Sequence, residues 1–137
     1  MKLDYDCVRD ILLYVEDNAD IEHDAVFKNV LGNCFHDPNK YYPCSVVADK
    51  YGYDVVYYHL NYCCKARLIE PYDDYADTIS VSDLTPAGHD FLANIRDDSI
   101  WNNIKDISNK VGSRSLDALV QISSNVVTTL IKSQFGI

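Results

Sequence analysis

The sequence predicts a mainly helical α+β fold in which amphipathic helices pack around a small β-hairpin. Apolar residues recur at helical spacing from Leu3 to Val15 and again from Leu116 to Ile131. Between these two ends, a helix–glycine–helix pattern begins at Ser45 and an alternating apolar run begins at Thr78. A chain of 137 residues, of which 47% are hydrophobic, is long enough to form a core of its own.

The first third of the chain contains one clear helix and one ambiguous segment. Asp4 to Glu16 is predicted as a helix, because its apolar residues share one face and acidic residues suit its N-terminus. Asp17 to Asp24 is an acidic connector. Ala25 to Phe35 has no clear period and fits either a short helix or a strand. His36 to Lys40 contains a proline and is predicted as a turn.

Two helices separated by a glycine are predicted next. Ser45 to Tyr51 forms the first helix, and Gly52 suits the left-handed conformation that often ends one. Asp54 is placed to cap the second helix, which runs to about Ala66. Two helices joined by such a short turn indicate a helix-turn-helix.

A β-hairpin and a further helix extend this pattern. Leu68 to Glu70 and Thr78 to Leu84 are predicted as strands on either side of a polar turn from Pro71 to Asp77. Thr85 with the following proline suits the start of another helix. We therefore predict a winged helix-turn-helix over Ser45 to Ile95, with the hairpin as its wing.

The C-terminal part of the chain is predicted as two more helices, Ser99 to Val111 and Ser115 to about Ser133. We expect residues 1–97 to form the winged-helix domain, including the N-terminal helix, and residues 98–137 to form a helical extension. The last helix has a broad apolar face and few charges, so another surface must cover it. We expect a homodimer whose interface includes Trp101, Leu116, Leu119, Val120, Val127 and Leu130.

The net charge is −9, and the negative excess lies in the first two-thirds of the chain. Residues 1–97 hold 8 basic and 18 acidic side chains, whereas residues 98–137 hold 4 and 3. A field of this sign repels phosphate backbones unless basic residues are locally concentrated. The charge balance therefore weighs against DNA binding.

Two stretches resemble winged-helix regulators. Val56 to Leu60, continued by Ala66 to Glu70, resembles the V-x-x-H-L…A-G-L-I pattern that spans their second helix and first wing strand. Leu84 to Leu92 resembles the L-T-x-x-G-x-x-F-L run that opens the helix after the wing. Arg67 stands where those proteins usually have glycine, which predicts a different end to the helix.

Nearly the whole chain is also similar to a family of short winged-helix proteins of bacteria and their prophages. The similarity includes the runs Met1 to Asp4 and Val8 to Leu12 at the start. It continues in the runs Gly88 to Leu92 and Ile95 to Asp98, followed by Trp101. The resemblance implies a fold and a phage or mobile-element setting, and no activity.

The leading functional prediction is a small DNA-binding regulator. In winged-helix regulators the outward face of the second helix enters the major groove. An asparagine there pairs with adenine, whereas lysine and tyrosine reach phosphates. The residues predicted for this role are Asp54, Val55, Tyr57, Tyr58, Asn61 and Lys65.

The alternative is a protein-interaction module that engages a host or phage protein, in competition with nucleic acid or without binding it. An acidic, tyrosine-rich surface suits a basic partner, because tyrosine is a frequent interface anchor. The acidic connector is one candidate surface. The other is the predicted wing, with Tyr72, Asp73, Asp74, Tyr75 and Asp77.

Catalysis and cofactor binding are not predicted. Cys34, His36 and Cys44, with His23 as a distant fourth ligand, do not match paired C-x-x-C metal spacing. No phosphate loop or nucleophile motif accompanies the histidines. The absence of a signal peptide or long apolar run predicts a cytoplasmic protein that does not enter membranes, with free thiols.

Overall fold

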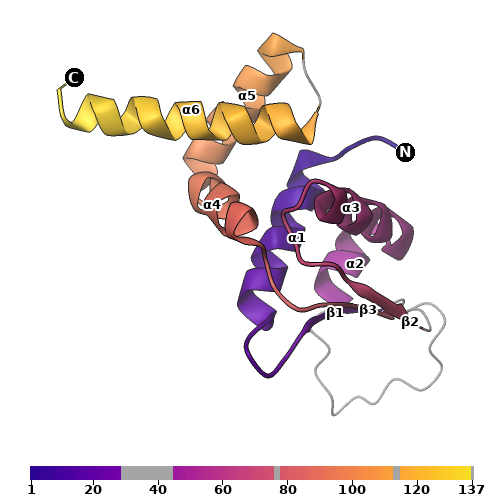
Figure 1. The fold of residues 1–137 in the computed structure, drawn as a ribbon. Coiled ribbons are helices and arrows are strands. Elements are labelled where there is room, and N and C mark those ends of the chain that lie inside the picture. Colours follow the sequence, from indigo (N-terminus) through magenta and orange to yellow (C-terminus); the bar gives the residue numbers. More distant parts are fainter. Residues whose placement is uncertain (29–44, 76–77, 113–114, 137) are drawn as a thin grey trace.

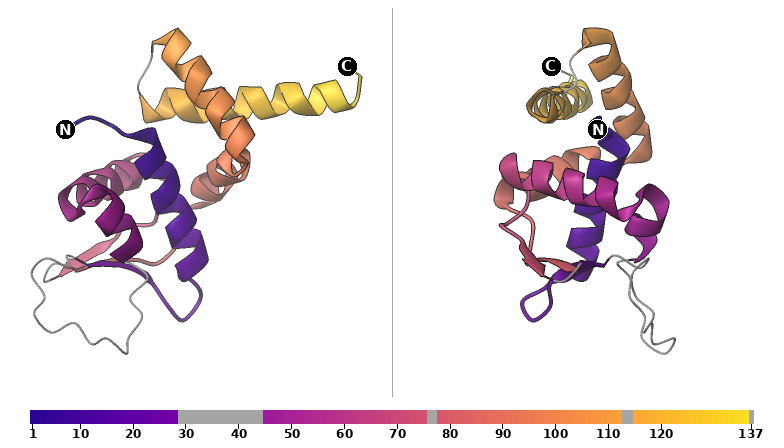
Figure 2. Two further views of the ribbon diagram at one scale, coloured as in Figure 1. Left: turned by 180° about the vertical axis from the view of Figure 1, so that it is seen from behind. Right: turned by 90° about the vertical axis from the view of Figure 1, so that its right-hand side faces the viewer.

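The computed structural model describes residues 1–28, 45–75, 78–112 and 115–136 of the chain. It confirms a mainly helical fold with a small antiparallel sheet, whose strand order is β1-β3-β2 (Figure 1). The sheet lies at the end of the molecule remote from the last helix (Figure 2). The elements are α1 (Tyr5–Asn18), β1 (Ala25–Lys28), α2 (Ser45–Tyr51), α3 (Tyr53–Lys65), β2 (Asp73–Tyr75), β3 (Thr78–Val81), α4 (Pro86–Ile95), α5 (Asp98–Val111) and α6 (Leu116–Gln134).

The start of α1 is held by its own cap and by a histidine of α3. The Asp4 carboxylate accepts hydrogen bonds from the backbone N–H groups of Asp6 and Cys7. The Asp4 backbone N–H donates to Nε2 of the buried His59 at 2.8 Å, and Nδ1 of His59 lies 2.7 Å from the Val55 carbonyl oxygen. These partners require a neutral imidazole with its proton on Nδ1. His59 is therefore a structural residue that joins α1 to α3.

The sheet differs from the predicted hairpin. Ala25–Lys28, within the segment left open between helix and strand, forms β1 and pairs with β3. The predicted strand over Leu68–Glu70 is wrong: only Ile69 makes an isolated bridge, to Leu84. Pro71 has no N–H to donate, so the ladder with β3 resumes beyond it, within the stretch predicted as a turn. The rest of the ambiguous segment and the predicted turn at His36–Lys40 lie outside the described residues.

One glycine joins α2 to α3. The Gly52 N–H donates to the Ala48 carbonyl at 2.7 Å, which ends α2, and the Gly52 carbonyl accepts from Val56 N–H at 3.1 Å, which begins α3. Its φ of +88° is one that side-chain-bearing residues rarely adopt. The prediction that Asp54 caps α3 is wrong, because Gly52 occupies the N-cap and Asp54 lies in the first turn.

The end of α3 is a Schellman motif. The Arg67 N–H donates to the Cys64 carbonyl at 3.0 Å, and the Leu68 N–H donates to the Cys63 carbonyl at 2.9 Å. Arg67 lies at the left-handed position of this motif, with φ +61°, where glycine is the usual residue. The arginine at this position therefore strains the backbone without changing the motif.

Replacing this arginine should stabilise the protein. We expect Arg67→Gly to raise the free energy of unfolding by about 1 kcal/mol, because glycine removes the Cβ clash of the left-handed conformation. Ala66→Gly is the matched control: Ala66 has φ −79°, so glycine there only adds entropy to the unfolded chain and should destabilise. Urea unfolding of both variants checks this, and equal losses of stability would contradict it.

The start of α4 packs directly on the end of α3. The Thr85 hydroxyl accepts from the Gly88 N–H at 3.0 Å and donates to the Arg67 carbonyl oxygen. The Thr85 N–H donates to the Leu68 carbonyl at 3.1 Å. A Cβ built on Gly88 would lie 1.9 Å from that same Leu68 carbonyl oxygen. The glycine is thus required by the close approach of the two backbones.

The C-terminal helices are fastened to α1 through a tryptophan. Trp101 is 2% exposed, and its indole N–H donates to the Asp6 carboxylate at 2.8 Å. The Arg9 guanidinium lies 5.7 Å from the ring centre and the Lys105 ammonium 5.5 Å from it. Burial pushes the pKa of Asp6 upward, but the hydrogen bonds from Lys105 and Trp101 outweigh it and leave the pKa below its ordinary value.

The last helix lies across α4 and α5. Leu116, Leu119 and Ser123 are buried on the side of α6 that meets them. Further along, α6 extends beyond both helices and ends away from the rest of the molecule (Figures 1 and 2). Among the described residues, the buried positions of α6 therefore lie in its first half, whereas Val126 and Val127 in the second half are half-buried.

Candidate interaction surface

The six residues predicted to contact DNA lie along α3, and three of them are exposed. Asp54 and Lys65 are exposed at the two ends of the helix. Tyr57 is 36% exposed between them, and Asn61 is half-buried. These four side chains give α3 an outward polar face.

The other two predicted residues of α3 contribute less to that face. Val55 is half-buried against the core, and its backbone carbonyl accepts a hydrogen bond from the Nδ1–H group of His59. The half-buried Tyr58 packs beside His59 and Tyr62, with ring centres 5.2 and 6.1 Å away. The structure therefore places Val55 and Tyr58 at the margin of the outward face.

Tyrosines and a carboxylate connect α3 to the sheet. The Tyr57 hydroxyl donates to the Asp74 carboxylate at 2.9 Å, and the Tyr57 ring meets the Tyr72 ring edge-on with centres 6.4 Å apart. The Tyr72 hydroxyl donates to the side-chain amide oxygen, Oδ1, of Asn61 at 3.4 Å. The two sites predicted separately, on α3 and on the wing, are thus one continuous surface. This α3–β2 surface consists of Asp54, Tyr57, Asn61, Tyr72 and Asp74, and Asp73 lies at its edge, on the other face of β2.

The remaining two residues of the predicted wing site are described only in part. Tyr75 is the last residue of β2, where it pairs with Thr78 of β3. Asp77 lies outside the described residues.

The α3–β2 surface is acidic. The two elements hold three carboxylates, of Asp54, Asp73 and Asp74, and one basic residue, Lys65. All four side chains are exposed, so each meets solvent or a partner directly. The hydrogen bond to the Asp74 carboxylate raises the pKa of Tyr57 to about 12, so this tyrosine stays protonated as a donor at neutral pH.

Arg9 and Arg96, which lie in the runs Val8 to Leu12 and Ile95 to Asp98, hold helices together. Arg9 donates to the backbone carbonyls of Ile95 and Arg96, at 3.0 and 2.7 Å, and to the Asp98 carboxylate at 2.7 Å. Arg96 donates to the Glu16 carboxylate at 2.5 Å, and this bond lowers the pKa of Glu16. These charges join α1 to the segment between α4 and α5, and they do not gather into a site.

Three of the residues predicted for a dimer interface are buried within the chain. Leu116 is 2% exposed and Leu119 is fully buried, like Trp101 described above. Their apolar surface already packs against α4, α5 or α1, so it is not available to a second subunit. Val120 and Val127 are half-buried, and Leu130 is 43% exposed.

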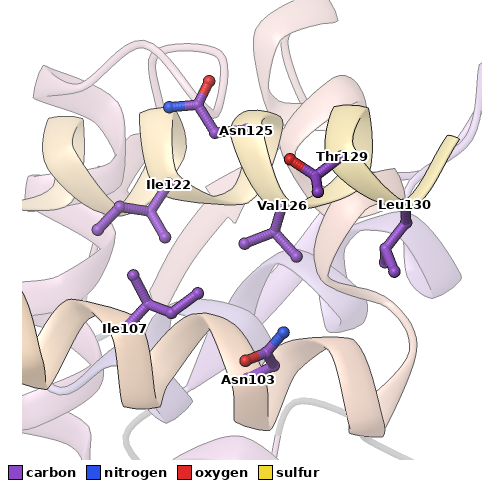
Figure 3. Close-up of a pocket in the computed structure, with 7 residues that line it drawn as sticks. All are labelled: Asn103, Ile107, Ile122, Asn125, Val126, Thr129 and Leu130. Carbon is purple, nitrogen blue, oxygen red and sulfur yellow. The ribbon is translucent and has the colours of Figure 1, made fainter. Parts of the chain in front are cut away.

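A groove runs between α5 and the middle and later part of α6 (Figure 3). Its volume is about 340 Å³. Ile107 of α5 faces Ile122 and Val126 of α6 across it. We did not predict this groove as a site, although the broad apolar coverage of the last helix was a signal for it. The groove is lined by Asn103, Ile107, Ile122, Asn125, Val126, Thr129 and Leu130.

A metal centre is not assembled by the described residues, which contain no group of three or more histidine, cysteine, aspartate or glutamate ligands. Cys34, His36 and Cys44 lie outside the described part of the chain. The His23 imidazole is hydrogen-bonded to the Asp20 carboxylate. Burial raises the pKa of the Cys7 thiol to about 12, which makes it a poor nucleophile.

Comparison with known proteins gives a family. A protein of Haemophilus influenzae described as "Uncharacterized protein" is 27% identical over 136 residues, which are 96% of this chain and 99% of that protein. No solved structure matches the chain significantly. In the described segments, no helix combines the length and apolar character needed to cross a membrane. The family model described as "Hypothetical protein (DUF2513)" matches residues 2–114, from α1 to the end of α5, and the chain belongs to that family.

Proposed function

We propose that α1 to β3 form a winged helix whose α3–β2 surface binds a protein with a basic surface. The order helix, strand, two helices and two antiparallel strands supports the winged-helix assignment. So does the tight turn at Gly52, which leaves α3 in the position of a recognition helix next to the hairpin.

The hydrogen bond between Tyr57 and Asp74 is the observation that favours a protein partner. It places a carboxylate beside the centre of α3, where a DNA reader would meet phosphates. The exposed Asp54 adds a second negative charge to the same surface, and the exposed Asp73 adds a third at its edge, from the other face of β2. Duplex DNA would have to approach three carboxylates with one lysine in compensation, and the electrostatic work opposes that.

The same groups suit lysine and arginine side chains. The carboxylates of Asp54, Asp73 and Asp74 can accept charge-assisted hydrogen bonds from a basic partner. The rings of Tyr57 and Tyr72 offer faces and edges against which a guanidinium can pack. Tyrosine also contributes large contact area at a low cost in side-chain entropy.

Duplex DNA is the second candidate function. Lys65 is exposed at the C-terminal end of α3 and Arg67 is exposed two residues later, so two cations lie beyond the acidic residues. Asn61, on the same helix, has the side chain that pairs with adenine. Binding through these residues would use the end of α3 instead of its centre.

Two fluorescence anisotropy titrations distinguish these functions, with an arginine- and lysine-rich peptide and a random duplex DNA as labelled probes at ~50 mM salt. We expect the peptide to bind, and the triple variant Asp54→Asn/Asp73→Asn/Asp74→Asn to weaken it about tenfold, since three exposed charge pairs contribute up to ~1 kcal/mol each. The duplex should not bind.

The matched control removes three exposed charges from the acidic connector, as Asp17→Asn/Glu22→Gln/Asp24→Asn. It changes the net charge equally, so it should leave peptide affinity within about twofold if the α3–β2 surface is the site. Equal weakening by both triple variants would reject that surface. Duplex binding that Lys65→Ala abolishes would replace the proposal with DNA recognition.

A further inference from the structure

β2 forms an open edge of the sheet. Within the described residues, β3 is the strand that pairs with it, and the side of β2 turned away from β3 has no backbone partner (Figure 1). Each residue of a strand directs its N–H and C=O groups to one side, and successive residues alternate. Part of the backbone of Asp73–Tyr75 therefore faces outward, where its donors and acceptors are available to another strand.

The strand at the opposite edge, β1, is packed against helices. Both α1 and α2 contact it. The Tyr14 hydroxyl of α1 donates to the Val26 carbonyl at 2.8 Å, and the Tyr14 ring lies against Phe27 with ring centres 4.7 Å apart. Among the described residues, β2 is joined to a helix by the side-chain hydrogen bond between Tyr57 and Asp74. β2 is therefore the more accessible of the two edge strands.

The two aspartates of β2 lie on opposite faces of the sheet. Asp74 is opposite the fully buried Ile79 of β3, so its side chain is on the face that packs against the core. Asp73 is opposite Ser80, so its side chain is on the other face. Both aspartates are exposed. The edge of β2 thus presents one carboxylate on each face of the sheet.

This arrangement favours one shape of basic partner. A partner that lies against α3 reaches Asp54 and Asp74, whereas Asp73 is on the far face of the sheet. A strand added to the edge meets both aspartates of β2, because its own successive side chains alternate between the two faces. Opposite charges on neighbouring strands stabilise their pairing. Two consecutive basic residues of an extended segment can therefore pair with both carboxylates.

The aromatic side chains near Asp74 also suit a basic strand. The Tyr72 ring lies edge-on to the Tyr57 ring, with centres 6.4 Å apart, and the Tyr57 hydroxyl binds the Asp74 carboxylate. A guanidinium or ammonium group that reaches Asp74 from an added strand would lie near these rings, which attract cations. A basic side chain on this face is thus stabilised by a carboxylate and by aromatic rings together.

We propose that the basic partner adds an extended segment to the open edge of β2, with two consecutive arginine or lysine side chains on Asp74 and Asp73. Backbone hydrogen bonds to β2 supply affinity, and the carboxylates on the two faces supply the preference for basic residues. This inference rests on the proposed function, because it specifies how a basic protein is held. It also gives Asp73 a role that a ligand lying on α3 would not.

A backbone-modified probe tests the strand pairing. The arginine- and lysine-rich peptide of the anisotropy titration is compared with the same peptide N-methylated along its central residues, which keeps every charge and removes backbone donors. We expect the N-methylated peptide to bind at least about tenfold more weakly, because backbone hydrogen bonds are lost. Hydrogen exchange at the amides of β2 should slow with the unmodified peptide and stay unchanged with the N-methylated one.

Single charge removals locate the bound segment on the edge. Asp73→Asn and Asp74→Asn should each weaken binding of the unmodified peptide about two- to threefold, because each removes one exposed charge pair. Asp90→Asn is the matched control, since it removes an exposed carboxylate of α4, and it should leave the affinity unchanged.

The outcomes separate strand addition from the proposed function. If both peptides bind equally well, strand addition is wrong and the proposed function stands. The same holds if Asp74→Asn weakens binding and Asp73→Asn does not, because the partner then lies on the α3 face. If neither peptide binds, both proposals are wrong.

Discussion

Gly88→Ala is expected to lower the free energy of unfolding by about 3 kcal/mol or more. The added Cβ would lie 1.9 Å from the Leu68 carbonyl oxygen, and the nearest atoms are backbone, so no side chain can rotate away. The first turn of α4 would have to separate from the end of α3. That separation would also break the hydrogen bond from the Thr85 N–H to the same carbonyl. Urea unfolding followed by circular dichroism measures the loss.

Gly112→Ala is the matched control for this variant. Gly112, unlike Gly88, has a positive φ, +79°, and nothing lies within 4 Å of the position its Cβ would take. Its cost is therefore that of the left-handed conformation alone, about 1–2 kcal/mol. If Gly88→Ala costs no more than Gly112→Ala, the close contact between α4 and Leu68 is not the reason for the glycine.

Trp101→Ala should be comparably damaging, with a loss of about 3–5 kcal/mol. The substitution empties a buried position between α1 and α5 and removes the donor that pairs with Asp6. It also removes the ring on which Arg9 and Lys105 pack. For a domain of ordinary stability this is a large fraction of the total, so the midpoint of thermal unfolding should fall steeply.

Trp101→Phe separates packing from hydrogen bonding. It keeps an aromatic ring and loses the indole N–H, so we expect it to cost about 1–2 kcal/mol. A Trp101→Phe protein as stable as the wild type would show that the hydrogen bond from the indole N–H to Asp6 contributes nothing to stability.

Much of the helical fold could be predicted because its signals are local. Apolar periodicity and capping residues such as Thr85 act within one or two turns, and the structure has Thr85 at the predicted cap. The strands were less predictable, because a register depends on the partner strand. Pro71 moved the ladder past the expected position, and the sequence pattern alone could not indicate which residues of β3 would pair beyond it.

The candidate site was predictable in composition and not in geometry. The residue types of the α3–β2 surface were identified, but the contact between Tyr57 and Asp74 joins positions 17 apart in the chain. Trp101 lies 95 positions from Asp6, the residue that its indole N–H binds. Helical spacing shows which face of a helix is apolar, and it does not show which neighbouring element covers that face. For this reason a predicted interface residue proved to be a core residue.

The position of β2 in the sheet gives its two aspartates a further consequence. In the order β1-β3-β2, the far side of β2 is an edge, and within the described residues no strand pairs with it. The unpaired backbone groups of an edge strand can recruit strands from other molecules, and charged side chains discourage this. Asp73 and Asp74 are exposed on that strand, so the same carboxylates that would attract a basic partner also keep the sheet from growing into an aggregate.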